Sequence, residues 1–178
     1  MTARQCLSHT SGLPFASAAE LRHCGGVERF SSSKFAHYRE TNDDSVYDEL
    51  PLAVAVASYA VEPLLSAPGT RFHYSNAGIN LVGRIIECIS GEVFSDFVDR
   101  QLLAPLGMAS TSLWPSREQL QQLAKSYSSS EPPRRNGLVE VPFPQLTAPY
   151  HDRSRGAAPS GGYFSTVADC VRFGSECP

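Results

Sequence analysis

Tyr74 and Asn76 are the residues of this chain whose types and spacing best suit chemistry. Residues 72–74 read as the end of an extended segment, and apolar residues recur at helical spacing from position 76 onward. Side chains two positions apart can point the same way at such a junction, where the first backbone N–H groups of the helix are free. A phenol, with an ordinary pKa of about 10, acts as a base near neutrality only beside a cation, or relays a proton to a lysine. By spacing alone, however, the pair is more typical of polar side chains that close a helix entrance.

Three other groupings contain residue types found in catalysis. Ser8 and His9 are adjacent, but neighbouring side chains on a helix point apart, so we expect the hydroxyl and the imidazole to bond backbone groups. Ser31 and Lys34 have Ser-x-x-Lys spacing, and His23-Cys24-Gly25 has the form His-x-Gly. These last two lie in a polar, aperiodic stretch and are more typical of a surface loop than of a reaction centre.

Apolar periodicity and capping residues predict the helices that would position these side chains. The helix after Ser75 should end at Gly91, and its predicted apolar side consists of Gly78, Leu81, Val82, Ile85, Ile86 and Ile89. Capping-box spacing marks two further helix starts, at Thr2 with Gln5 and at Ser116 with Gln119. The predicted helices cover residues 1–9, 52–65, 76–90, 94–104, 116–124 and 166 onward, with a strand at 138–141.

Composition divides the chain into regular and irregular parts. Residues 17–50 are polar and aperiodic and are interpreted as a variable surface excursion, whereas residues 127–158 form a connection rich in proline, serine and arginine. Pro159-Ser160-Gly161-Gly162 is turn chemistry that allows close backbone approach. We therefore treat residues 1–178 as one unit, with Ser160 in a turn role.

The charge and cysteine content exclude several classes of function. The net charge is −3, and the 15 lysine and arginine residues are scattered, which argues against nucleic acid as a partner. The five cysteines have no metal-like spacing, and Cys88 fits a small buried apolar residue, so neither a metal nor a cofactor is expected. The chain contains no signal-peptide pattern and no membrane span, which leaves its localisation unassigned.

Four segments, taken together and in order, resemble the serine β-lactamase-like family of class C β-lactamases, DD-peptidases and related esterases. They are TARQCLSHTSGLP at 2–14, PGTRFHYSNAGINLVGRIIECISG at 68–91, LLAPLGM at 102–108 and APSGGYFSTVADCVRF at 158–173. The family fold is a sheet flanked by helices plus a mostly helical second domain, with the active site between them. The resemblance covers the middle of that domain and implies a helix-rich α+β fold that lacks the terminal sheet strands.

The resemblance also implies roles for particular residues. Tyr74 matches the tyrosine of the family's Tyr-x-Asn motif, which moves the proton of the nucleophilic serine and of the leaving group. Asn76 matches the asparagine that bonds the substrate and a lysine, and Ser160, Gly161 and Gly162 match a segment beside the mouth of the active site. The reaction implied is acyl transfer from an amide, ester or β-lactam carbonyl of a small molecule or a peptide, without a cofactor.

The family's other two motifs have no counterpart at the matching positions. Its Ser-x-x-Lys precedes the segment that contains SHTSG, and its Lys/His-x-Gly follows the segment that contains SGG. We therefore expect a truncated chain that is inactive alone; the alternative is a non-catalytic remnant or a protein-binding module. The last helix carries Val167, Val171 and Phe173, which in the family lean on a sheet, so self-association through exposed apolar surface is also expected.

Overall fold

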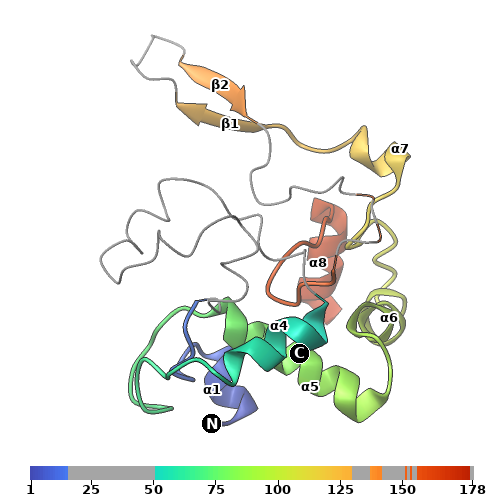
Figure 1. Cartoon of the computed structure of the whole chain (residues 1–178). Coiled ribbons are helices and arrows are strands. Elements are labelled where there is room, and N and C mark those ends of the chain that lie inside the picture. Colours follow the sequence, from blue (N-terminus) through green and yellow to red (C-terminus); the bar gives the residue numbers. More distant parts are fainter. Residues whose placement is uncertain (16–50, 130–136, 142–150, 152, 154–155, 177–178) are drawn as a thin grey trace.

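The computed structural model describes residues 1–15, 51–129, 137–141, 151, 153 and 156–176 (Figure 1). Ser31, Lys34 and the segment 23–25, together with the whole 17–50 excursion and much of 127–158, lie outside these residues. The described helices are α1 (Ala3–Leu7), α4 (Leu52–Tyr59), α5 (Asn76–Ser90), α6 (Phe94–Val98), the π-helix η4 (Asp99–Leu103), α7 (Arg117–Leu120) and α8 (Val167–Glu176). The described strands are β1 (Ser126–Ser129) and β2 (Leu138–Val141).

Helix α5 is the centre of the helical part, because α1, α4 and α6 all pack against it (Figure 1). Its predicted limits are confirmed. Ser75 caps the start, its Oγ accepting the Gly78 N–H at 3.0 Å, and Gly91 ends the helix with a left-handed φ of 72°. Both predicted capping boxes are also present, at Thr2 with Gln5 and at Ser116 with Gln119.

The buried face of α5 differs from the predicted apolar stripe. Its buried residues are small or polar: Asn76, Ala77, Gly78, Asn80 and Gly83. By contrast, Ile85 and Ile89 are 37% and 82% exposed, and Cys88 is exposed rather than buried. The reason is that α1 approaches α5 closely: a Cβ on Gly78 would lie 3.3 Å from the Cys6 carbonyl oxygen. Only the side of α5 that carries small residues can pack this closely.

The hydrophobic core lies between α4, α5 and the turn that follows α1. Its buried cluster is formed by Leu13, Ala55, Tyr59 and Ala77, with Val56 and Leu81 packed against it. Helix α4 ends at Tyr59 instead of continuing to residue 65, and α7 ends at Leu120 instead of residue 124. The helix predicted over 94–104 is present but widens into the π-helix η4 over its second half.

Strands β1 and β2 form an antiparallel hairpin, in register from Ser126 opposite Val141 to Ser129 opposite Leu138. The strand at 138–141 was predicted, and β1 was not, because its serine-rich sequence has no apolar alternation. In Figure 1 the hairpin lies at the top of the view, apart from the helices around α5. None of the described helices is long and apolar enough to cross a membrane.

Asp169 fixes α8 to the segment that follows η4. Its carboxylate is 1% exposed and accepts hydrogen bonds from the Ser110 N–H at 2.8 Å and Thr111 Oγ1 at 2.9 Å. Arg172 Nη1 donates to the same carboxylate at 2.6 Å, and the Asp169 N–H donates to Thr166 Oγ1 at 3.3 Å, which caps the start of the helix. Asp169 thus lies in the first turn of α8 and also connects the helix to Ser110, which is 59 residues away in sequence.

We predict that this carboxylate makes stability depend on pH in the acid range. Burial opposes ionisation of Asp169, but the hydrogen bonds from Thr111, Ser110 and Arg172 outweigh it and lower its pKa. A lowered folded pKa contributes stability that is present above the unfolded value of about 3.9 and is lost as the pH falls through the folded pKa. Melting temperatures of the parent and of Asp169→Asn should therefore converge below about pH 4. A constant gap between them down to pH 2 would contradict this assignment.

Candidate functional site

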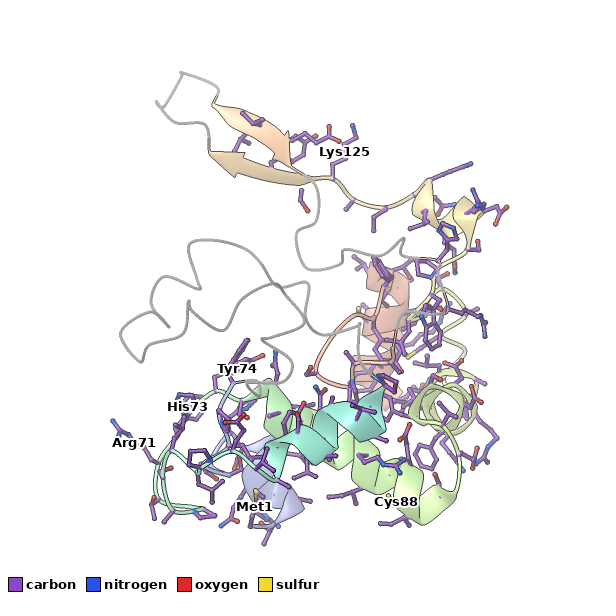
Figure 2. All side chains as sticks on the ribbon, viewed as in Figure 1. Met1, Arg71, His73, Tyr74, Cys88 and Lys125 are labelled. Atoms are coloured by element: carbon purple, nitrogen blue, oxygen red, sulfur yellow. The ribbon has the colours of Figure 1, made fainter. Side chains whose placement is uncertain are left out.

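Tyr74 and Asn76 lie at the start of α5, as the sequence predicts. Tyr74 precedes the helix and is 52% exposed, and its ring projects from the loop that leads into α5 (Figure 2). Asn76 is the first helical residue and is only 8% exposed. The pair thus combines a solvent-accessible phenol with a buried amide.

Ser75, between them, determines this arrangement. Its side chain is fully buried, donates to the Pro14 carbonyl oxygen at 2.7 Å and accepts the Gly78 N–H at 3.0 Å. Its own N–H donates to His9 Nδ1 at 3.2 Å. The extended backbone at Ser75, with φ of −144° and ψ of 113°, places successive side chains on opposite sides, so burying the serine directs Tyr74 outward.

The segment after α1 holds the Tyr74 loop through its backbone. The Ala77 N–H donates to the Phe15 carbonyl oxygen at 3.1 Å, and the His73 N–H donates to the His9 carbonyl oxygen at 2.8 Å. The expectation that the His9 imidazole bonds a backbone group is confirmed, since its partner is the Ser75 N–H. Ser8 differs: its hydroxyl pairs with Thr10 Oγ1 at 3.0 Å.

The amide oxygen of Asn76 is a buried acceptor that has no hydrogen-bond partner among the described residues. Native proteins satisfy nearly all buried polar atoms, so such an atom in a native fold requires a physical explanation. Two other side-chain atoms on the stretch that leads into α5 share this condition, Ser66 Oγ and His73 Nδ1. Of the five such atoms among the described residues, three therefore belong to the segment that runs into α5, and the other two are His151 Nδ1 and the Tyr163 hydroxyl.

Asn80 joins this helix start to the Ser160-Gly161-Gly162 segment. It is 2% exposed, its Nδ2 donates to the Tyr59 hydroxyl at 3.2 Å, and its Oδ1 accepts the Ser160 N–H at 3.1 Å. Sequence reasoning missed this residue. The available signal was its position four residues after Asn76, which puts both amides on one face of α5.

The turn predicted at Ser160 is present and packs closely on α5. The Gly161 N–H donates to the Ala158 carbonyl oxygen at 3.0 Å, and Gly162 has a positive φ of 93°. A Cβ on Gly83 would lie 2.2 Å from Pro159 Cγ, so only glycine permits this approach. Asn76, Asn80 and Gly83 follow at helical spacing, so the turn packs along the helix face that carries the amide of Asn76.

The arrangement can move protons and bind polar groups. The accessible phenol of Tyr74 can accept and return a proton, and the Asn76 amide can bond a substrate carbonyl or a cation. Neither group is a nucleophile for a carbonyl carbon in this arrangement. Among the described residues, no group of three or more His, Cys, Asp or Glu side chains could hold a metal ion.

Comparison with known proteins identifies relatives along nearly the whole chain. The chain is 28% identical to esterase EstB of Burkholderia gladioli over an alignment of 181 residues, which covers 97% of this chain and 43% of that protein. It is 26% identical to the D-alanyl-D-alanine-carboxypeptidase/endopeptidase AmpH of Escherichia coli over 110 residues, 62% of this chain and 24% of that protein. The chain thus spans less than half the length of these relatives.

Comparison with solved structures identifies the fold. The D-amino acid amidase of Ochrobactrum anthropi matches with a TM-score of 0.61 at 22% identity, covering 97% of this chain and 42% of the amidase. The fold is therefore that of the β-lactamase and transpeptidase proteins, represented among the described residues by helices and one hairpin. The family model described as Beta-lactamase matches residues 1–176. Because that match covers nearly all 178 residues, the chain belongs to the β-lactamase family.

Proposed function

We propose that this chain forms part of a serine hydrolase that transfers acyl groups from an amide, ester or β-lactam carbonyl. The observation that carries the proposal is the buried Oδ1 of Asn76, which has no hydrogen-bond partner among the described residues, two positions after the exposed phenol of Tyr74. In this role Asn76 holds the substrate and a neighbouring lysine, and Tyr74 is the base or proton relay. Ser160, Gly161 and Gly162 line the mouth of the site from the turn against α5.

In the reaction that we propose, Tyr74 carries the transferred proton. The nucleophilic serine of the family motif bonds to the carbonyl carbon and the carbonyl π electrons move to oxygen, while the serine proton passes to the Tyr74 oxygen, which acts as the phenolate in this step. The proton then moves to the leaving group as the bond between that group and the carbon breaks. Water releases the acyl group in a second attack, and the Asn76 amide keeps the substrate oriented through both steps.

The substrate class is an acyl compound, either a small molecule or a peptide. The named relatives are an esterase, a carboxypeptidase/endopeptidase and an amidase, and the step that their names share is cleavage of an acyl–oxygen or acyl–nitrogen bond. We propose further that residues 1–178 form a helix-rich part of the domain, without the terminal strands of the sheet. Among the described residues the strands form one two-stranded sheet, which is consistent with this proposal.

We predict that this chain alone hydrolyses neither nitrocefin nor p-nitrophenyl acetate above the level of a denatured control. Tyr74 needs a cation to act as a base near neutrality, and of the two lysines in the sequence, Lys34 lies outside the described residues. The other, Lys125, pairs with Glu140 at 2.8 Å beside the hairpin, well away from Tyr74 in Figure 2. Covalent labelling by a fluorophosphonate, mapped to a serine of this chain, would contradict the prediction, and Ser31 is the position to inspect first.

The alternative function, a non-catalytic or protein-binding module, is favoured by the exposed apolar side chains of α8. Val167, Val171 and Phe173 are 82%, 63% and 42% exposed. Val167 and Val171 are four residues apart and share one side of α8, and exposed apolar side chains so placed promote association; the partner we propose is a second copy of this chain.

We accordingly predict that Val167→Glu lowers self-association at least tenfold, as measured by sedimentation equilibrium. A glutamate there places charge on the apolar side of α8 but suits the first turn of a helix, so the helix should persist. Val61→Glu is the matched control, because Val61 is also 82% exposed but lies just beyond α4. A parent chain that stays monomeric, or equal effects of the two substitutions, would contradict the prediction.

A further inference from the structure

His9 has a backbone conformation that few residues other than glycine adopt. Its φ is 55°, and it is the sole non-glycine residue with positive φ within the described parts of the chain. Side chains other than glycine enter this region at a cost, and such conformations persist where the surrounding contacts enforce them. The contacts that hold His9 in this conformation therefore indicate its role.

Those contacts converge on both backbone neighbours of Tyr74. The His9 carbonyl oxygen accepts the His73 N–H at 2.8 Å, and His9 Nδ1 accepts the Ser75 N–H at 3.2 Å. The positive φ lets the carbonyl and the side chain of one residue face the same loop. The Ser75 N–H is the donor in this bond, so Nδ1 is the acceptor.

The imidazole ring also contacts the aromatic side chains of that loop. Its centroid lies 4.4 Å from that of the Tyr74 ring, with 35° between the planes, and 5.9 Å from that of Phe72 in an edge-on arrangement. Offset and edge-on contacts at these distances are favourable and directional. The Tyr74 ring, although half-exposed, thus packs against the His9 imidazole on one of its faces.

We propose that His9 is a positioning residue for Tyr74, holding its backbone through Nδ1 and the carbonyl oxygen and its ring through the imidazole face. The inference rests on the proposed role of Tyr74 in proton transfer and adds the residue that aims the phenol. In this role His9 acts through Tyr74 and not on the substrate itself. The conformational cost at His9 is offset by these contacts.

Two substitutions separate the backbone contact from the ring contact. Asparagine tolerates positive φ, and its Oδ1 can replace Nδ1 as the acceptor, but it has no ring. Glycine removes both contacts and relieves the backbone. In native-state hydrogen exchange of this chain, we expect the Ser75 amide to exchange about tenfold faster in His9→Gly, the usual effect of one lost hydrogen bond. In His9→Asn it should stay within about twofold of the parent.

The aromatic NMR signals of Tyr74 report the second contact. Both variants should lose the ring-current shift that the imidazole imposes on Tyr74, whereas the signals of Tyr127, which is 54% exposed on β1, should not change. Unchanged Tyr74 signals in His9→Asn would overturn the proposal, and so would equal loss of Ser75 protection in both variants. If His9→Gly does not fold, His9→Asn still tests the ring contact.

This experiment is independent of catalysis. If the His9 variants behave as expected but loss of the Tyr74 hydroxyl leaves acylation unchanged, the positioning is correct and the proposed function is wrong. If loss of the hydroxyl slows acylation but the Tyr74 signals do not change in the His9 variants, the proposed function is correct and the positioning role of His9 is wrong.

Discussion

Replacing Tyr74 by phenylalanine is expected to slow acylation by about 10²–10⁴-fold, the usual range for losing a positioned proton-transfer group. The measurement requires a longer protein, in which a Ser-x-x-Lys segment precedes this chain and a Lys/His-x-Gly segment follows it. The substitution removes only the hydroxyl, and the ring contacts with His9 and Phe15, at 4.4 and 6.0 Å between centroids, should persist. The melting temperature should therefore change little.

Tyr127→Phe is the matched control for this experiment. Tyr127 is 54% exposed, close to the 52% of Tyr74, but lies in the hairpin. Burst-phase kinetics with p-nitrophenyl acetate would separate the acylation rate from deacylation. If the Tyr74 variant acylates within a few-fold of both the parent and the control, the phenol is not the proton carrier.

The largest expected effect on stability is at Gly12, where alanine should cost about 2–5 kcal/mol. Gly12 has a φ of 81°, and a Cβ there would lie 2.1 Å from the Ser66 backbone carbonyl oxygen. The left-handed conformation accounts for roughly 1–2 kcal/mol of this cost, and the forced movement of the backbone for about 1–3 kcal/mol more. Since domains are stable by about 5–15 kcal/mol, this one methyl group can remove a large share of the total.

Gly91→Ala separates the two contributions. Gly91 also has a positive φ, 72°, but a Cβ there would meet no atom within 4 Å. Its cost should be only about 1–2 kcal/mol, that of the left-handed conformation. Urea unfolding of both variants measures the difference. Equal costs would show that the loop around Ser66 moves aside freely.

Local signals in the sequence were sufficient for the helix starts and ends of the central region. The side chains of Thr2 and Ser116 each cap the residues that their spacing indicated, and Gly91 ends α5. Such signals act within a few residues, so they can be read without knowledge of the tertiary structure. The Tyr74 and Asn76 junction was predicted for the same reason.

Packing across the chain could not be predicted in this way. Ile89 fits an apolar stripe by periodicity but is 82% exposed, because Gly78 and Gly83 determine which side of α5 other segments can approach. The roles of Asn80 and His9 were likewise hidden, since their partners lie 80 and 66 residues away in sequence. β1 becomes a strand through its pairing with β2, which is a non-local interaction as well.

The hydrogen bond between Asn80 and Ser160 also has a consequence for the order of folding. Long-range contacts of this kind form slowly, because chain entropy must be lost before they contribute. During synthesis, α5 emerges from the ribosome about 80 residues before the backbone group that satisfies its buried amide. The early contacts of α5 with α1 and α4 can therefore form first, while the face that carries Asn76 and Asn80 stays incomplete. The candidate site is consequently among the last parts of this chain to assemble.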